Sequence, residues 1–186
     1  MQALSKPTER ELTALARQVV DRLKLLRLRI VLAESCTGGL VSALLTRIPG
    51  VSEFHCGSAV VYQIATKAEW LGVPKPLLQN PGPVSREVAS KMVEGVLATT
   101  PHANIAAAVT GHLGPGAPRG QDGLVYISFA HRFRARRSFK VTVTRHELAK
   151  EAGDSIQNPE RKRLRRQQSA AAHVLSQILT ELAETN

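Results

Sequence analysis

Two short apolar segments each run directly into a hydroxyl residue and glycine, and this repeated pattern does most to limit the possible folds. Residues 29–35 (RIVLAES) are followed by CTGG, and residues 104–111 (NIAAAVTG) end in a Thr-Gly pair. Short, continuous apolar runs of this kind are typical of strands buried on both faces of a sheet. Because the carboxyl ends of parallel strands meet at one edge, we expect the two glycine turns to converge on a single crevice.

Helical and strand-like segments alternate along the rest of the chain. Thr8 and Ser85 each precede an amphipathic segment and are suited to be helix N-caps, whereas residues 72–83 are rich in proline and glycine, which predicts a loop. The alternation predicts one domain, residues 1–186, with a three-layer α/β/α fold around a mixed, mainly parallel sheet. Further strands are expected at 57–62, 124–131 and 137–144, helices at 7–25, 66–71, 86–100 and 159–183, and a buried stripe in the last helix at Leu164, Ala171, Leu175, Ile178 and Leu182.

Composition excludes several classes of protein. With 43% hydrophobic and 22% charged residues, the chain has the balance of a globular domain rather than of a disordered segment. Its apolar runs fall short of the roughly 20 residues that span a bilayer, and its N-terminus lacks the apolar core of a signal peptide. We therefore expect a cytoplasmic protein without membrane association. Cys36 and Cys56 lack metal-site spacing and the histidines are scattered, so no metal and no cofactor is expected.

The formal net charge of +10 favours an anionic partner, either a phosphorylated small molecule or a nucleic acid. Arginines cluster at 132–137 and 161–166, but the chain has only four Phe, two Tyr and one Trp to stack on bases, which makes a nucleic acid the less favoured partner. At about 100° per residue, Arg161 lies near the buried stripe of the last helix. Lys162, Arg163 and Arg166 should point away from it, so Arg161 is the basic residue expected to reach inward.

The first turn offers a candidate nucleophile. Ser35 ends a predicted strand, and the glycines that open the next helix leave backbone N–H groups unpaired, which suits an oxyanion or a phosphate. A capped strand-to-helix turn without chemistry fits the same spacing. Cys36 is the rival nucleophile: side chains alternate along a strand, so one of the two should face the crevice, and the sequence leaves open which.

A serine nucleophile needs a base, and the chain has no GxSxG elbow or evident Ser–His–Asp set. Tyr62 ends the second predicted strand, and Lys67 follows five residues later. A lysine whose pKa is lowered by partial burial, or a tyrosine beside a cation, could accept the proton of Ser35. A solvated lysine on a helix surface is the alternative.

Four ordered blocks of this sequence together resemble the CinA C-terminal domain family. They are AESCTGGLVSALLTRIPGVS, VVYQIATKAEWLGVP, GPVSREVASKMVEGV, and AVTGHLGPGAP with DGLVYISFA. Family members of this kind hydrolyse the carboxamide of nicotinamide mononucleotide, giving nicotinic acid mononucleotide and ammonia. The resemblance thus implies an amidohydrolase that needs no metal, acts on a phosphorylated small molecule and associates as a homo-oligomer.

The resemblance also implies roles for individual residues. Ser35 corresponds to the nucleophile, Tyr62 and Lys67 to the pair that activates it, and Arg161 to a phosphate or substrate contact. The two turns fall on the substrate-binding positions Thr37, Gly38, Gly39, Thr110 and Gly111.

Two departures from the family pattern concern substrate identity and catalysis. The family commonly reads TGIAGPGGG, whereas this chain has TGHLGPGAP with His112 in the loop, and Pro159-Glu160 replaces a Gly-Asp pair after an apparent insertion within 145–158. A relative that binds a nucleotide without turning it over is therefore an alternative. Many relatives carry an additional N-terminal molybdopterin-binding-like domain, which we do not find in this sequence, so we expect no pyrophosphatase activity from it.

Overall fold

The chain forms a five-stranded mixed sheet in the strand order β2-β1-β3-β4-β5. A computed structural model describes residues 7–133, 138–148 and 158–184. β1 pairs in parallel with β2 and β3, and the pairs β3–β4 and β4–β5 are antiparallel, so four of the five strands point the same way. The strands are β1 (Ile30–Glu34), β2 (His55–Val60), β3 (Ile105–Gly111), β4 (Leu124–Phe133) and β5 (Ser138–Glu147).

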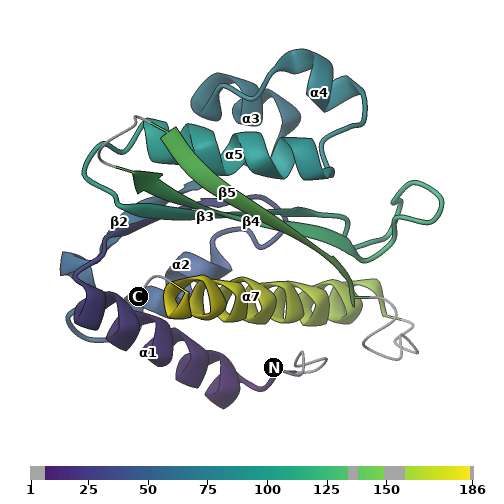
Figure 1. Ribbon diagram of the computed structural model, residues 1–186. Coiled ribbons are helices and arrows are strands. Elements are labelled where there is room, and N and C mark those ends of the chain that lie inside the picture. The colour runs from purple at the N-terminus through teal and green to yellow at the C-terminus, as the bar shows by residue number, and fades with distance from the viewer. Residues whose placement is uncertain (1–6, 134–137, 149–157, 185–186) are drawn as a thin grey trace.

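Helices cover both faces of this sheet, which confirms the expected three-layer α/β fold (Figure 1). Each helical layer buries its own apolar cluster against one face of the sheet. In the part of the chain that the structure describes, no helix is both long and apolar enough to span a bilayer. One layer contains α1 (Glu9–Leu26), α2 (Leu40–Thr46) and α7 (Pro159–Ala183), and the other contains α3 (Ile64–Leu71), α4 (Lys75–Gln79) and α5 (Arg86–Ala98).

Both predicted N-caps are confirmed. The Thr8 hydroxyl accepts a hydrogen bond from the Glu11 N–H at 3.3 Å in a capping box, and the Ser85 hydroxyl accepts one from the Val88 N–H at 3.3 Å. The expected loop at 72–83 instead contains the short helix α4. Its proline lies in the first turn, where a backbone N–H has no helical partner and is not missed.

The predicted buried stripe of α7 is wrong at its N-terminal end. Leu164 is 55% exposed, whereas Arg166, which was expected to face solvent, is 1% exposed. The cause is a bidentate ion pair in which the Arg166 guanidinium donates to the two carboxylate oxygens of Asp122 at 2.7 and 2.9 Å. The other predicted stripe residues, Ala171, Leu175, Ile178 and Leu182, are buried. Arg134, Arg136 and Arg137, which belong to the arginine cluster at 132–137, lie outside the described residues.

The register of the sheet brings the predicted turns together. Glu34 at the end of β1 is opposite Val60 in β2 and Val109 in β3. Because these residues lie side by side in the sheet, the segments that follow them leave the sheet at the same edge. This confirms the expectation that the two glycine turns meet there.

Candidate active site

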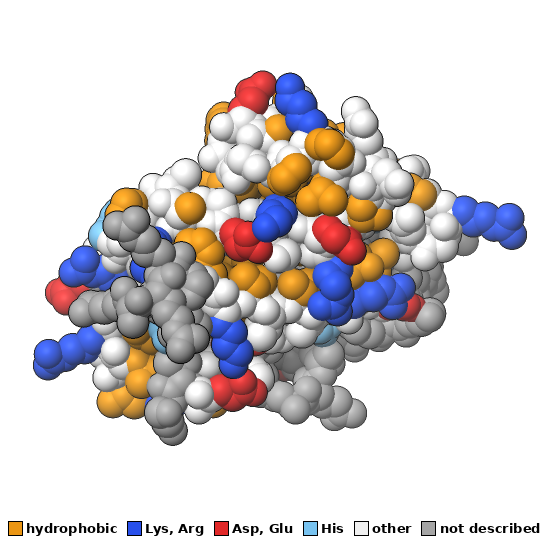
Figure 2. Space-filling model, turned by 45° about the horizontal axis from the view of Figure 1, so that its top comes forward, with side chains coloured by type: hydrophobic (Ala, Val, Ile, Leu, Met, Phe, Trp, Pro, Cys, Tyr) orange, Lys and Arg blue, Asp and Glu red, His pale blue; other side chains and the backbone are white. Residues whose placement is uncertain are grey.

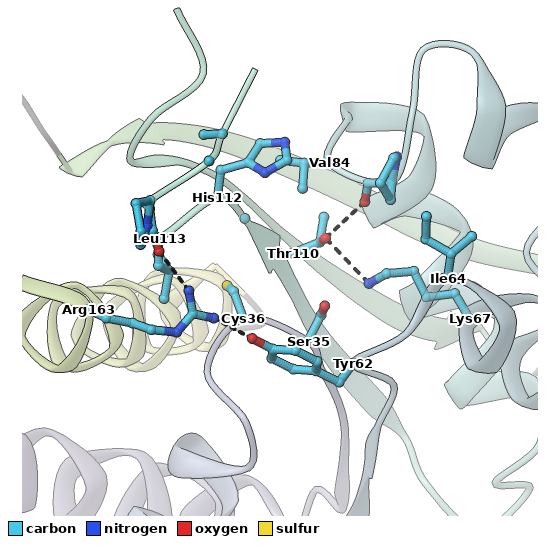
Figure 3. Close-up of a pocket in the computed structure, with 16 residues that line it drawn as sticks. Ser35, Cys36, Tyr62, Ile64, Lys67, Val84, Thr110, His112, Leu113 and Arg163 are labelled. Atoms are coloured by element: carbon cyan, nitrogen blue, oxygen red, sulfur yellow. Dashed lines mark hydrogen bonds between the residues drawn. The ribbon is translucent and has the colours of Figure 1, made fainter. Parts of the chain in front are cut away.

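A cavity of about 230 Å³ lies at this edge, where β1, β2 and β3 end. Figure 3 shows Lys67 and Thr110 on one side of it and Arg163 on the other, with Ser35 and Tyr62 between them. These side chains come from β3, the α3 and α7 helices, and the segments that follow β1 and β2. The structure thus places the hydroxyl after the first strand and the amine after the second in one cavity.

Ser35 is the first residue after β1 and is 7% exposed. Its backbone is fixed, because its N–H donates to the Val109 carbonyl at 3.1 Å and its carbonyl accepts from the Gly38 N–H at 3.0 Å. Its hydroxyl, in contrast, forms no hydrogen bond with any described residue. The side chain is therefore held in place while its oxygen stays available to a ligand.

The turn after Ser35 is built on Glu34, which sequence reasoning did not single out. This carboxylate is 1% exposed. The signal was present in the sequence as an acidic residue within an apolar strand, where a charge needs several partners. Four donors reach its two oxygens: the Thr37 hydroxyl at 2.7 Å, the Val41 and Ser42 N–H groups at 3.0 and 2.9 Å, and the Ser58 hydroxyl at 3.2 Å.

Thr37, Gly38 and Gly39 were predicted to bind substrate, but none of the three lines the cavity. The Thr37 hydroxyl is directed to Glu34 instead. Gly38 and Gly39 have φ values of 63° and 97°, which L side chains rarely adopt, so these glycines shape the turn.

Lys67 is only 2% exposed, so the alternative of a solvated surface lysine is wrong. Its Nζ lies 3.4 Å from the Thr110 hydroxyl oxygen and 3.5 Å from the Met92 sulfur, and it forms no ion pair within the described residues. Burial disfavours the charged amine and lowers its pKa to about 8. A neutral amine is consequently accessible near physiological pH.

Thr110 and Gly111 close the cavity from the β3 side. Thr110 is 1% exposed, and its hydroxyl donates to the Pro83 carbonyl at 2.9 Å while it accepts from Lys67. A Cβ at Gly111 would lie 2.7 Å from a Val125 methyl carbon and 3.2 Å from the Cys36 sulfur. Glycine is thus required there for the strand and the first turn to approach each other.

Cys36, the rival nucleophile, also borders the cavity but packs into the apolar core at 3% exposure. Burial raises the pKa of its thiol to about 12, in spite of the opposing effect of the Lys67 charge. Because the thiolate is the nucleophilic form of cysteine, this environment favours Ser35.

Arg163 crosses the mouth of the cavity and was missed at the sequence level. Its guanidinium donates to the Gly114 carbonyl at 2.9 Å and to the Tyr62 hydroxyl. Tyr62 lines the cavity at 55% exposure, and its hydroxyl is directed to Arg163 rather than to Lys67. Tyr62 was expected to assist Lys67, but no hydrogen bond joins the two side chains.

The expectation that Arg161 reaches inward is wrong. Its side chain is exposed and does not line the cavity, and its backbone N–H donates to the Asn158 cap at 2.9 Å. The Arg166–Asp122 pair fixes the rotation of α7, which turns Arg163 toward the cavity and Arg161 away from it. The hydrogen bond from Arg166 also lowers the pKa of the Asp122 carboxyl.

The glycine loop after β3 forms the rim of the cavity opposite Lys67. His112 lies there, anchored through its backbone to Leu124 and Gly123, and burial lowers the pKa of its ring. Within the described residues, the backbone N–H groups of Gly114 and Gly116 form no hydrogen bond with other backbone atoms. They and Arg163 offer donors to an anionic ligand. No group of three His, Cys, Asp or Glu suited to hold a metal occurs in the described part of the chain.

Comparison with known proteins identifies the family. The model of the CinA C-terminal domain matches residues 12–179. The chain belongs to the CinA C-terminal domain family. Among curated relatives of this CinA domain, a Pseudomonas putida protein named nicotinamide-nucleotide amidohydrolase PncC is 37% identical over 133 residues, which cover 69% of this chain and 82% of that protein.

Other relatives of the CinA domain here are longer. CinA-like proteins of Dictyoglomus thermophilum and Myxococcus xanthus are 46% and 39% identical over 117 and 136 residues, or 62% and 70% of this chain. The chain spans only 28% and 31% of their lengths. The crystal structure of the competence/damage inducible protein CihA from Agrobacterium tumefaciens has a TM-score of 0.79 and 29% identity, covering 98% of this chain and 99% of that one.

Proposed function

We propose that this protein hydrolyses the carboxamide of nicotinamide mononucleotide to nicotinic acid mononucleotide and ammonia, with Ser35 as the nucleophile. The observation that carries the proposal is the shared cavity of the unbonded Ser35 hydroxyl and the buried Lys67 amine, whose pKa is lowered to about 8. The name of the Pseudomonas putida relative, a nicotinamide-nucleotide amidohydrolase, supports the choice of reaction.

The chemistry is an acyl transfer in two halves. Neutral Lys67 accepts the proton of the Ser35 hydroxyl as the oxygen attacks the amide carbon, which gives a tetrahedral oxyanion. Collapse of this intermediate breaks the C–N bond, and Lys67 returns the proton to the departing ammonia. Lys67 then deprotonates a water that attacks the ester carbon, and it returns this proton to the Ser35 oxygen as the ester bond breaks and the carboxylic acid leaves.

Thr110 is the residue that orients the base. Its oxygen accepts from Lys67 while its own proton is donated to the Pro83 carbonyl, so the amine is directed into the cavity without a carboxylate that would keep it charged. The backbone N–H group of Cys36, which borders the cavity and forms no backbone hydrogen bond, is a candidate donor to the oxyanion. Loss of one such donor typically slows turnover by about 100-fold or more.

Arg163 is the proposed contact of the substrate phosphate, in the place that the sequence suggested for Arg161. It lies at the cavity mouth beside the free N–H groups of Gly114 and Gly116, and a guanidinium binds phosphate oxygens bidentately. The formal net charge of +10 adds a favourable long-range potential for an anionic substrate.

The experiment is to measure ammonia release from a panel of amide-bearing pyridine compounds. We expect turnover of nicotinamide mononucleotide, weaker use of the riboside that lacks the phosphate, and no loss of activity in a chelator. Binding of the mononucleotide without ammonia release would identify a relative that has lost catalysis. Absence of both binding and turnover would contradict the proposal.

We also propose a homo-oligomer. Large hydrophobic side chains are exposed at the end of the edge strand β2 and in and around α3. Figure 2 shows hydrophobic side chains interspersed with charged ones on the face that carries α3, α4 and α5. The residues are Val60, Tyr62, Ile64 and Trp70. Light scattering should give a multiple of the 20.2 kDa chain mass, and a Trp70→Glu variant should shift it toward the monomer.

A further inference from the structure

A second cavity, of about 710 Å³, lies at the opposite edge of the sheet, where β1 and β3 begin. We call it the basic cavity, because five of the residues that line it are arginines or histidines. Among the described residues that line it, none is Asp or Glu. The five are Arg27, Arg29, His102, His131 and Arg132.

The backbone around the basic cavity is held firmly. The Arg29 N–H donates to the Asn104 side-chain oxygen at 2.8 Å, and the Asn104 N–H donates to the Arg29 carbonyl at 2.9 Å. The pairing of Ile105 with His131 places the end of β4 at the same edge. The arginine and histidine side chains therefore surround a fixed frame, formed where β1 and β3 begin and β4 ends.

One of these cations is already used within the fold. The Arg132 guanidinium donates to the carbonyls of Ala103 at 3.1 Å and Thr100 at 3.2 Å, and to that of Leu97. These carbonyls lie in the last turn of α5 and in the segment between α5 and β3. Arg132 accordingly contributes positive charge to the wall of the cavity but few free donors.

Arg27 and Arg29 differ from Arg132 in this respect. Both are exposed, and their side chains form no hydrogen bond or ion pair with the described residues. Arg27 also caps α1 in the left-handed region with φ of 52°, the only non-glycine residue described with positive φ. A position that normally favours glycine thus carries a guanidinium at the rim of the cavity.

We propose that the basic cavity binds a small anion that carries two phosphoryl groups, one for each free guanidinium of Arg27 and Arg29. Planar guanidinium groups match phosphate oxygens bidentately, and a concave site without acidic residues leaves their charge uncompensated. His102, exposed at the same cavity, adds a further donor. No Phe, Tyr or Trp is among the described lining residues, which disfavours a nucleic acid that would stack its bases.

This site is separate from the cavity of Ser35. Arg29 precedes β1 and Ser35 follows it, while Asn104 precedes β3 and Thr110 lies near its carboxyl end. The two cavities share none of their lining residues. The proposal consequently does not depend on the deamidase activity.

The probe is inorganic pyrophosphate, titrated into the protein by calorimetry at low salt. We expect one site per chain and at least a tenfold loss of affinity in the Arg27→Gln/Arg29→Gln double variant. The matched control is Arg10→Gln/Arg17→Gln, which removes the same charge from exposed positions of α1 outside the cavity and should change affinity less than twofold. The side chains of Arg27 and Arg29 have no hydrogen bond or ion pair with the described residues to lose, and circular dichroism checks that both variants fold.

Three results would overturn the proposal. The first is failure of the wild-type protein to bind pyrophosphate. The second is an equal loss of affinity in the two double variants, which would indicate general charge attraction. In the third, an Arg163→Gln variant loses binding while Arg27→Gln/Arg29→Gln retains it, which places the anion in the Ser35 cavity. If the double variant does not fold, the single variants Arg27→Gln and Arg29→Gln decide, each expected to weaken binding measurably.

Discussion

The amine of Lys67 lies 3.4 Å from the hydroxyl oxygen of Thr110, and that hydroxyl donates to the Pro83 carbonyl at 2.9 Å. This arrangement holds a lysine in the interior with a neutral acceptor in place of a carboxylate. A carboxylate would favour the ammonium form, whereas burial without a charged partner lowers the pKa of Lys67 to about 8. The relationship therefore converts an ordinary lysine into a group that can accept a proton.

The first prediction concerns pH. If neutral Lys67 is the base, kcat/KM should rise about tenfold per pH unit up to a midpoint near pH 8, set by its pKa of about 8, and level off above it. Lys67→Arg should be inactive throughout, because a guanidinium stays protonated. A flat profile from pH 6 to 9, or an active Lys67→Arg variant, would show that another group is the base.

The second prediction concerns Thr110. Thr110→Val keeps the shape of the side chain but removes the acceptor that stabilises the ammonium form, so the midpoint of the pH profile should fall. Turnover at its plateau should drop by about tenfold or more as Lys67 loses its orientation. Thr110→Ser, which keeps the hydroxyl, is the control and should restore both values. An unchanged midpoint in Thr110→Val argues against the positioning role.

The third prediction separates two arginines two residues apart on α7. Arg163→Gln should raise KM for the mononucleotide by about 10- to 100-fold, since a charge-assisted hydrogen bond contributes about 1.5–3 kcal/mol. The riboside, which has no phosphate, should be affected much less. Arg161→Gln is the matched control and should leave both KM values near those of the wild type, because its side chain is exposed. A larger rise in KM for Arg161→Gln than for Arg163→Gln would instead support Arg161 as the phosphate contact, as expected from the sequence.

The fourth prediction concerns the buried carboxylate under the turn. Glu34→Gln places an amide among four donors, so at least one buried N–H or hydroxyl loses its acceptor. We expect a loss of about 2–4 kcal/mol in the free energy of unfolding, measured in urea. Ser58→Ala removes only the most distant donor, at 3.2 Å, and should lose about 1 kcal/mol. Equal stability of Glu34→Gln and the wild type would mean that the carboxylate does not support the turn.

Much of this molecule could be predicted from local sequence. The strand before Ser35 and the strand that carries Thr110 were recognisable as short apolar runs, and level parallel strands necessarily bring their ends together. The helix caps Thr8 and Ser85 act within four residues of themselves, so the information needed to predict them is local.

The failures have a common physical origin in contacts between distant segments. The orientation of α7 depends on the pairing of Arg166 with Asp122, 44 residues away. The apolar periodicity within the helix cannot reveal a partner that lies outside the helix. The preference for Ser35 over Cys36 likewise depends on which side chain the core covers. The burial of Lys67 comes from packing of α3 against α5, which its own surroundings in the sequence do not reveal.

The central claim is that the Ser35 hydroxyl performs the attack, and the rate of ammonia release by Ser35→Ala tests it most directly. Against nicotinamide mononucleotide, the account predicts a loss of at least about 1,000-fold in kcat with binding of the mononucleotide retained, and only a modest loss in Cys36→Ala. Undiminished release by Ser35→Ala, or its loss in Cys36→Ala alone, would contradict the account.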